Sequence, residues 1–215
     1  MNRVRIKICG VTTAEDAAFA VDAGADAVGL NFYPKSPRYL SAERAEAVVR
    51  GLPPLAAAIG VFVDGTDHAA RTLAVRLGLS GVQTYRPEVP TVAFRPLAHL
   101  PAFRVKDAAD LDAVRGYVSA CAAAGRPVSA VLLDSFVPGE MGGTGHVAPW
   151  HLLAGFDPGV PVLLAGGLTP DNVAEAVRVV RPWGVDVASG VEAAPGRKDP
   201  GKVRAFVAAV RAAGS

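Results

Sequence analysis

The hydrophobic residues of this chain alternate between short apolar runs and helical stripes, and the alternation repeats along the whole sequence. Short apolar runs bounded by turn residues are typical of strands that are buried on both faces. Eight such runs occur. We predict strands at Arg5–Cys9, Ala27–Phe32, Ala57–Val63, Gly81–Tyr85, Leu97–Val105, Val128–Asp134, Pro161–Ala165 and Gly184–Ser189.

Helices are predicted between these runs wherever apolar residues recur at positions i, i+3, i+4 and i+7. The clearest stripes run over residues 45–52, 70–77, 173–180 and 203–210. Ser41 and Thr169 are the candidate N-caps, with Pro170 at the first helical position, and Gly78 follows the second of these stripes.

Strands that alternate with helices in this way favour a parallel sheet. With eight strand and helix repeats, we predict one α/β domain over residues 1–215, a single-domain (β/α)₈ TIM barrel. An open, doubly wound sheet is the alternative. In a barrel, polar residues and glycines at the carboxyl ends of the strands form the active site, so these positions are considered first.

The segment between the fourth and fifth predicted strands departs from the repeat. Residues 86–101 contain four prolines, which are incompatible with a full helix. We therefore predict an irregular or shortened crossover here.

Composition and charge exclude several classes of protein. With 51% hydrophobic and 20% charged residues, the chain is globular rather than disordered. The net charge of +2 includes no run of Lys or Arg suited to nucleic acid, so no nucleic-acid partner is expected. The longest apolar run, Leu55–Val63, is too short to span a membrane, and Met1–Lys7 does not resemble a signal peptide. We expect a cytoplasmic protein with no membrane partner.

The two cysteines lie far apart, and neither has metal-ligand spacing. We therefore expect no disulfide and no metal. Since no dinucleotide motif is present either, no cofactor is expected. Cys121 lies in an Ala-rich helical segment and is interpreted as a packing residue.

Cys9 ends the first predicted strand and is followed by Gly10, with Lys7 two residues before it. It is either a small buried hydrophobe or a thiolate base with a pKa lowered by cationic surroundings. Arg38 follows the second strand on a loop that Pro34 and Pro37 stiffen. It can bind a carboxylate or phosphate, or be an ordinary surface arginine.

Asp134 ends the sixth predicted strand, directly after apolar residues, where a carboxylate needs either a structural hydrogen bond or a catalytic role. A Gly-rich loop over residues 139–145 follows it and could form a lid. The pairs Gly166–Gly167 and Ser189–Gly190 follow the seventh and eighth strands. Together they predict a phosphate site built from backbone N–H groups.

These residues, taken in order, resemble the phosphoribosylanthranilate isomerase family of tryptophan biosynthesis. The motifs that carry the resemblance are Lys7-Ile8-Cys9-Gly10, Ser36-Pro37-Arg38, Gly60-Val61-Phe62, Leu132-Leu133-Asp134, Gly142-Gly143-Thr144-Gly145, Leu164-Ala165-Gly166-Gly167-Leu168 and Gly184-Val185-Asp186-Val187-Ala188-Ser189-Gly190-Val191-Glu192.

The resemblance implies an aldose–ketose isomerase that performs an Amadori rearrangement on N-(5-phosphoribosyl)anthranilate, a small-molecule phosphoribosyl substrate. Asp134 would be the general acid that opens the ribose ring, and Cys9 the general base that removes the C2 proton. Arg38 would pair with the anthranilate carboxylate. The remaining substrate-binding residues would be Lys7, Gly143, Gly166, Gly167, Ser189 and Gly190.

The chain departs from the family pattern at Asp64, Tyr85, His146 and Ala148, so parts of the substrate-facing wall are changed. A paralogue acting on a related N-ribosyl aromatic amine therefore remains an alternative, as does a non-catalytic barrel that binds a phosphate ligand. The related isomerase of histidine biosynthesis fits less well, because its substrate carries two phosphates and the first half of the chain has no second Gly-Gly pair. Monomer and homodimer both remain open.

Overall fold

A computed structural model of the chain describes residues 3–86, 88–134 and 150–214. Eight parallel strands form a closed barrel in which each strand pairs with the next in sequence, and β8 pairs with β1. The strands are β1 (Arg5–Cys9), β2 (Ala27–Asn31), β3 (Ala57–Phe62), β4 (Gly81–Thr84), β5 (Ala98–Arg104), β6 (Val131–Asp134), β7 (Val162–Ala165) and β8 (Gly184–Val187). The predicted (β/α)₈ barrel is confirmed.

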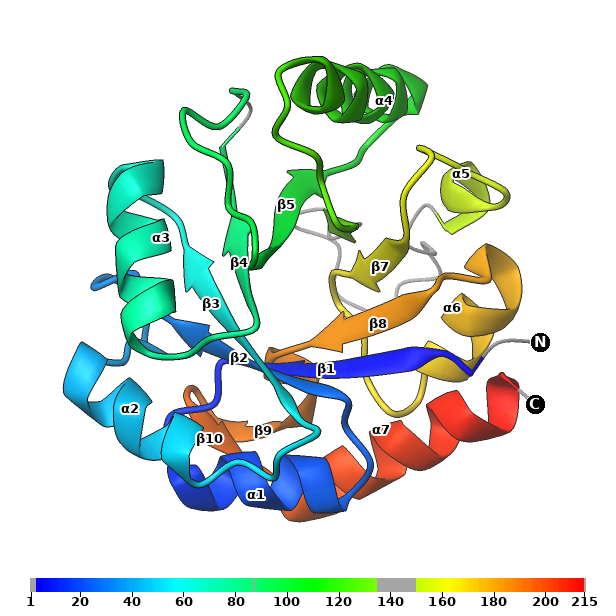
Figure 1. Cartoon of the computed structure of the whole chain (residues 1–215). Coiled ribbons are helices and arrows are strands. Elements are labelled where there is room, and N and C mark those ends of the chain that lie inside the picture. The colour runs from blue at the N-terminus through cyan, green and yellow to red at the C-terminus, as the bar shows by residue number, and fades with distance from the viewer. Residues whose placement is uncertain (1–2, 87, 135–149, 215) are drawn as a thin grey trace.

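Helices surround the barrel on its outside (Figure 1). They are α1 (Ala14–Asp22), α2 (Ala42–Arg50), α3 (Asp67–Arg76), α4 (Ala108–Ala123), α5 (Trp150–Leu153), α6 (Val173–Val180) and α7 (Pro200–Ala213). The predicted stripes form their buried faces: Val173, Ala176, Val177 and Val180 are buried in α6. Burying a side chain as large as Val contributes about 1.5–3 kcal/mol to stability. None of the described helices is long and apolar enough to cross a membrane.

Three strand and helix ends bear on the predictions. Ser41 caps α2, its hydroxyl accepting from the Arg44 backbone N–H, and Gly78 lies just beyond α3 with a φ of 66°, as expected. The predicted eighth strand is too long, because β8 ends at Val187 and Ser189–Val191 form a 3₁₀ turn, η1.

The predicted N-cap Thr169 is wrong. Helix α6 begins at Val173 with Asn172 as its N-cap residue, so Pro170 lies in the preceding turn. The cause is local: the Asn172 side chain accepts from the Thr169 N–H at 2.8 Å and donates to the Gly167 carbonyl at 3.0 Å. These bonds close a turn before the helix and hold the loop that follows β7.

The crossover between β4 and β5 is irregular, as predicted, and contains no helix among its described residues (Figure 1). The buried carboxylate of Asp67 anchors it. Asp67 accepts from Arg86 Nη1 at 2.8 Å and from the Thr91 N–H at 2.7 Å. These bonds fix both sides of the crossover to the start of α3, and thereby the position of Tyr85, which precedes Arg86.

Two apolar clusters make up the core. The larger one fills the space between strands and helices. The smaller one lies inside the barrel on β5, β6 and β7, and its buried members are Leu100, Ala102, Ala130, Leu132, Leu163 and Ala165. The opposite interior wall is polar, since Lys7, Gln83 and Asp186 are buried there on β1, β4 and β8. The buried charged side chains therefore lie on the side of the barrel interior formed by β1 and β8, near the carboxyl ends of these strands.

His99 in β5 gives a stability prediction. Its ring is buried, with Nε2 3.1 Å from Thr84 Oγ1 and the Phe94 ring at 4.6 Å between centroids. Burial lowers the His99 pKa from 6.5 to about 4. The unfolded chain therefore takes up this proton near pH 6.5 and the folded chain only near pH 4. Stability should fall between these values, by about 2–3 kcal/mol from this group.

Urea unfolding of wild type and His99→Gln at pH 7 and pH 4 measures this contribution. The variant loses stability at pH 7, but its deficit should shrink by about 2–3 kcal/mol at pH 4, because the variant has no buried imidazole to protonate. A deficit that is the same at both pH values contradicts the prediction.

Candidate active site

A cavity of about 270 Å³ opens at the carboxyl ends of the barrel strands. Five strands contribute to its wall: β1, β4, β6, β7 and β8, through their last residues or the loops that follow. The described lining residues are Cys9, Tyr85, Leu132, Asp134, Ala165, Gly166, Gly167, Leu168, Asp186, Val187, Ala188, Ser189 and Gly190. Most of the predicted site residues are thus brought together at one place.

Cys9 is the last residue of β1, and its side chain points into the barrel mouth beside Lys7. The neighbouring strand makes room for both, since a Cβ at Gly29 would lie 2.7 Å from Cys9 Sγ and 3.0 Å from Lys7 Nζ. A side chain at this position of β2 would displace the thiol. Glycine at position 29 is therefore required by the site.

The pKa of Cys9 differs from the expected lowering. Burial raises the pKa of the thiol above its ordinary value, and the Lys7 ammonium only partly opposes this. The carboxylate of Asp186, which is paired with Lys7, raises the Cys9 pKa further. Thiolate formation at this site therefore needs a higher pH than it does for a free cysteine.

Lys7 and Asp186 form a buried ion pair across the neighbouring strands β1 and β8. Lys7 Nζ donates to Asp186 Oδ1 at 2.8 Å, and the lysine is only 2% exposed. Burial alone would lower the Lys7 pKa, but Asp186 and Cys9 raise it above its ordinary value. Lys7 is therefore charged, and it carries a fixed positive charge beside the Cys9 sulfur.

Asp134 is the last residue of β6 and lies in register with Ala165 of β7. Its backbone carbonyl accepts from the Val105 N–H at 3.0 Å, which holds the strand end in place. The carboxylate lines the same cavity as Cys9. The Gly-rich loop that follows, with Gly143, His146 and Ala148, lies outside the described residues, as does the predicted lid.

The predicted phosphate residues lie on two adjacent loops of this cavity. Gly166 and Gly167 have φ values of 92° and 62°, which glycine adopts without strain. Ser189 and Gly190 begin η1, where a Cβ at Gly190 would lie 1.9 Å from the Leu168 carbonyl oxygen. Only glycine lets the two loops approach this closely. Backbone N–H groups from both loops can then face one anion.

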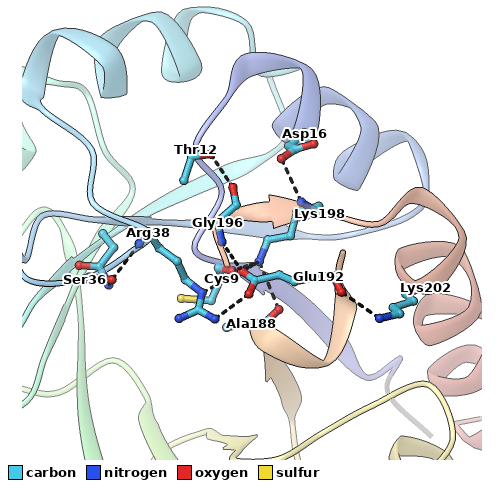
Figure 2. A network of polar contacts seen from close by, with 11 residues as sticks. Cys9, Thr12, Asp16, Ser36, Arg38, Ala188, Glu192, Gly196, Lys198 and Lys202 are labelled. Carbon is cyan, nitrogen blue, oxygen red and sulfur yellow. Dashed lines mark hydrogen bonds and ion pairs between the residues drawn. The ribbon is translucent and has the colours of Figure 1, made fainter. Parts of the chain in front are cut away.

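Arg38 lies on the loop after β2, which hydrogen bonds make rigid. Ser36 Oγ accepts from the Arg38 N–H at 3.1 Å and from Asn31 Nδ2 at 3.2 Å. A Cβ at Gly10 would lie 2.3 Å from Arg38 Cδ, so the arginine passes directly over the end of β1. The guanidinium binds Glu192 through two hydrogen bonds, with Nε to Oε1 at 2.8 Å and Nη2 to Oε2 at 2.6 Å (Figure 2).

The sequence pattern did not predict the hairpin that carries Glu192. Strands β9 (Glu192–Ala194) and β10 (Arg197–Lys198) pair antiparallel after η1. The Pro195-Gly196 dipeptide is a turn signal that could have revealed it. Lys198 on this hairpin is buried, and its ammonium contacts Glu192 and the Cys9 carbonyl (Figure 2).

Two of the departures from the family pattern can be placed. Tyr85 lines the cavity, and its hydroxyl accepts from Gln83 Nε2 at 2.9 Å. Burial and the nearby Cys9 and Asp186 raise the Tyr85 pKa, so this phenol stays protonated. The Asp64 backbone carbonyl accepts from Arg86 Nη2. Among the residues that the structure describes, no group of three or more His, Cys, Asp or Glu side chains could hold a metal ion.

Comparisons with known proteins place this site in a family. The family model described as N-(5'-phosphoribosyl)anthranilate (PRA) isomerase matches residues 6–209. A relative of that name from Myxococcus xanthus is 49% identical over 210 residues, covering 97% of this chain and 96% of the relative. Another from Geobacter sulfurreducens is 44% identical, covering 95% of this chain and 97% of the relative.

Solved structures agree. The phosphoribosyl anthranilate isomerase of Thermotoga maritima superposes with a TM-score of 0.83 at 36% identity, covering 97% of this chain and 99% of the other. A phosphoribosyl anthranilate isomerase in complex with reduced 1-(o-carboxyphenylamino)-1-deoxyribulose 5-phosphate gives a TM-score of 0.81 at 34% identity, with the same coverage. Similarity of this extent, together with a barrel whose strand ends gather a cysteine, an aspartate and two glycine loops, shows that the chain belongs to the N-(5'-phosphoribosyl)anthranilate isomerase family.

Proposed function

We propose that Cys9 and Asp134 are the acid–base pair with which this isomerase of tryptophan biosynthesis rearranges N-(5-phosphoribosyl)anthranilate into 1-(2-carboxyphenylamino)-1-deoxyribulose 5-phosphate. One observation carries the proposal: both side chains face a single cavity whose other wall is formed by the loops of Gly166–Gly167 and Ser189–Gly190. A phosphate held by these loops places the attached ribose between the thiol and the carboxyl group.

In the first step, Asp134 donates a proton to the ring oxygen of the ribose. The bond between C1 and that oxygen breaks, and the lone pair of the aryl nitrogen forms a C1=N bond. The product is an open-chain Schiff base in its protonated form. The Asp134 side chain is suited to this role by its position, because it is partly buried at the end of β6 and lines the cavity in which the ribose would lie.

In the second step, the Cys9 thiolate removes the proton from C2. The C–H electron pair forms a C1=C2 bond, and the C=N electrons return to nitrogen, which gives an enolamine. Transfer of the enol hydroxyl proton to C1 then yields the ketone. For the substrate, the proton gained from Asp134 balances the proton lost to Cys9, so the sum of the steps is an isomerisation. Exchange of protons with solvent returns Asp134 to its acid form and Cys9 to its thiolate. The Lys7 ammonium stabilises the thiolate that the second step requires.

Substrate binding follows from the same geometry. The backbone N–H groups of Gly166, Gly167, Ser189 and Gly190 would hold the phosphate. Arg38 would pair with the anthranilate carboxylate, since a planar guanidinium binds carboxylates through two parallel hydrogen bonds. Lys7 would act through its charge, because it is buried and its Nζ is bound to Asp186. Gly143, which lies outside the described residues, is proposed as a further substrate contact.

The protein is further proposed to work in the cytoplasm as one catalytic domain over residues 1–215, either as a monomer or as a homodimer. A solved relative from Thermotoga maritima is described as dimeric, with monomers generated from it. Light scattering on the purified protein distinguishes the two states.

The purified chain tests the reaction. Phosphoribosylanthranilate is generated in situ, and its fluorescence is followed after enzyme is added. Loss of fluorescence above the uncatalysed rate is the expected result. No acceleration by the wild-type protein would overturn the proposed function.

The pH dependence tests the role of the thiol. Since the Cys9 pKa is raised, little thiolate is present at neutral pH, and the alkylation rate of Cys9, measured in a Cys121→Ala background, should climb with pH. We expect this rate to level off only above about pH 8.5, the ordinary pKa of a thiol. An alkylation rate that already reaches its plateau at neutral pH contradicts the prediction.

A further inference from the structure

Two buried charged side chains, Glu192 and Lys198, lie behind Arg38 and have no part in the steps above. Both come from the β9–β10 hairpin, which packs against the ends of β1 and β8 (Figure 2). Charges are costly to bury unless they are paired and hydrogen-bonded. Their presence next to the site therefore calls for an explanation.

Glu192 binds Arg38 and Lys198 at the same time. One carboxylate oxygen accepts from Arg38 Nε at 2.8 Å and from Lys198 Nζ at 2.9 Å, and the other accepts from Arg38 Nη2 at 2.6 Å. The Gly196 N–H adds a longer bond of 3.3 Å. Burial alone would raise the Glu192 pKa, but the bonds from Arg38 and Lys198 lower it, so Glu192 is ionised.

Lys198 connects this carboxylate to the catalytic strand ends. Its side chain is fully buried, and Nζ also donates to the Cys9 carbonyl at 2.6 Å and to the Ala188 carbonyl at 3.2 Å. Glu192 is thereby fixed relative to the ends of β1 and β8. The Lys198 ammonium thus sets the position of the Glu192 carboxylate relative to Cys9 and to the Ser189–Gly190 loop.

The bonds to Glu192 use only one edge of the Arg38 guanidinium. A guanidinium has five N–H donors, and the edge formed by Nη1 and Nη2 can bind a second carboxylate. No described residue makes a hydrogen bond to Arg38 Nη1, and the arginine side chain is 22% exposed. The Cys9 thiol lies near enough to act on the Arg38 pKa.

We infer that Glu192, held by Lys198, is a positioning residue that fixes Arg38 with its free guanidinium edge toward the substrate carboxylate. The inference rests on the proposed function, because it assigns that carboxylate as the ligand of Arg38. The three side chains carry two positive charges and one negative charge. The cluster therefore keeps a net positive charge, which complements a carboxylate.

The opposite reading is that Glu192 competes with the substrate for Arg38, and the two readings predict effects of opposite sign. If Glu192 positions Arg38, removing its charge releases a flexible arginine, and the substrate must immobilise it on binding. KM then rises. If Glu192 competes, its removal frees Arg38, and KM falls.

Two variants separate the effect of Glu192 on the position of Arg38 from its effect on the net charge of the cluster. Glu192→Gln keeps the shape of the side chain but loses the second strong acceptor. The double variant Glu192→Gln/Lys198→Met removes the charge of the Arg38 partner together with the ammonium that holds it, and keeps the net charge of the cluster at that of the wild type. Glu46→Gln, which breaks the exposed pair of Glu46 with Arg50, is the matched control.

Each protein is assayed with N-(5-phosphoribosyl)anthranilate and with the aniline analogue, which lacks the carboxylate. The quantity compared is the ratio of kcat/KM for the two substrates. Both Glu192 variants should lower this ratio about tenfold or more, mainly through KM for the carboxylated substrate, and Glu46→Gln should leave it unchanged. Thermal unfolding is recorded alongside. A purely structural role lowers both rates together and leaves the ratio intact.

An unchanged or increased ratio in Glu192→Gln overturns the inference. That outcome leaves the proposed function standing, because wild type still turns over the anthranilate substrate. Failure of wild type to turn over that substrate is a failure of the proposed function instead. If the double variant does not fold, the isosteric variant Glu192→Gln still shows whether the ratio of kcat/KM falls or rises.

Discussion

Asp134→Asn is expected to lower kcat by about a thousandfold, the middle of the range that a positioned general acid contributes. An amide has nearly the shape of the carboxyl group, so the cavity and the strand end should be preserved. It has no acidic proton for the ring oxygen of the ribose, which makes ring opening slow. The loss should therefore fall on kcat, while KM changes little, because the phosphate and carboxylate contacts remain.

Steady-state kinetics on the fluorescent substrate measure this effect, with Asp112→Asn as the control. Asp112 is an exposed carboxylate on α4, and among the described residues its ion pair is with Arg115 on the same helix. Its variant should retain wild-type kcat. Cys9→Ser should also lose activity severely, since a hydroxyl is a far weaker acid than a thiol and supplies almost no anion near neutrality. Undiminished kcat in both Asp134→Asn and Cys9→Ser would rule out the mechanism.

The periodicity of the chain was sufficient to predict the barrel and the strand ends that carry the site. The strands of the closed barrel are largely buried, so each appears as a short apolar run. Cys9 and Asp134 could be found because a polar or reactive residue at the end of such a run is conspicuous. The pairs Gly166–Gly167 and Ser189–Gly190 could be found because only glycine permits their backbone geometry and close approach.

What the sequence did not predict depends on contacts between distant segments. The Glu192–Arg38 pair joins residues 154 positions apart, and no local pattern encodes it. The Cys9 pKa rises mainly because the folded barrel buries the thiol, and Asp186 on β8 opposes the lowering effect of Lys7. The Thr169 cap fails for a local reason, since Asn172 forms a competing turn three residues later.

The buried pair Lys7–Asp186 carries the second large prediction. Lys7→Met should destabilise the fold by about 3–5 kcal/mol, because it leaves the Asp186 carboxylate buried without its cation. For a chain of this length, a loss of that size corresponds to a fall in Tm of about 6–20 °C. Thermal and urea unfolding measure it. Arg50→Met, which breaks the exposed pair with Glu46, should change stability by less than about 1 kcal/mol.

A double variant separates the structural role of Lys7 from its role beside the thiol. In Lys7→Met/Asp186→Leu both charges are gone, and replacing a buried ion pair with apolar groups is often neutral or stabilising. Stability should therefore return close to that of wild type. Activity should not return, because the Cys9 thiolate loses its neighbouring cation and its pKa rises further. If activity recovers together with stability, Lys7 serves the fold alone. If Lys7→Met is as stable as wild type, the buried Asp186 carboxylate does not depend on the Lys7 ammonium for its stability. In that case the interior of the barrel is more polarisable than its close packing indicates.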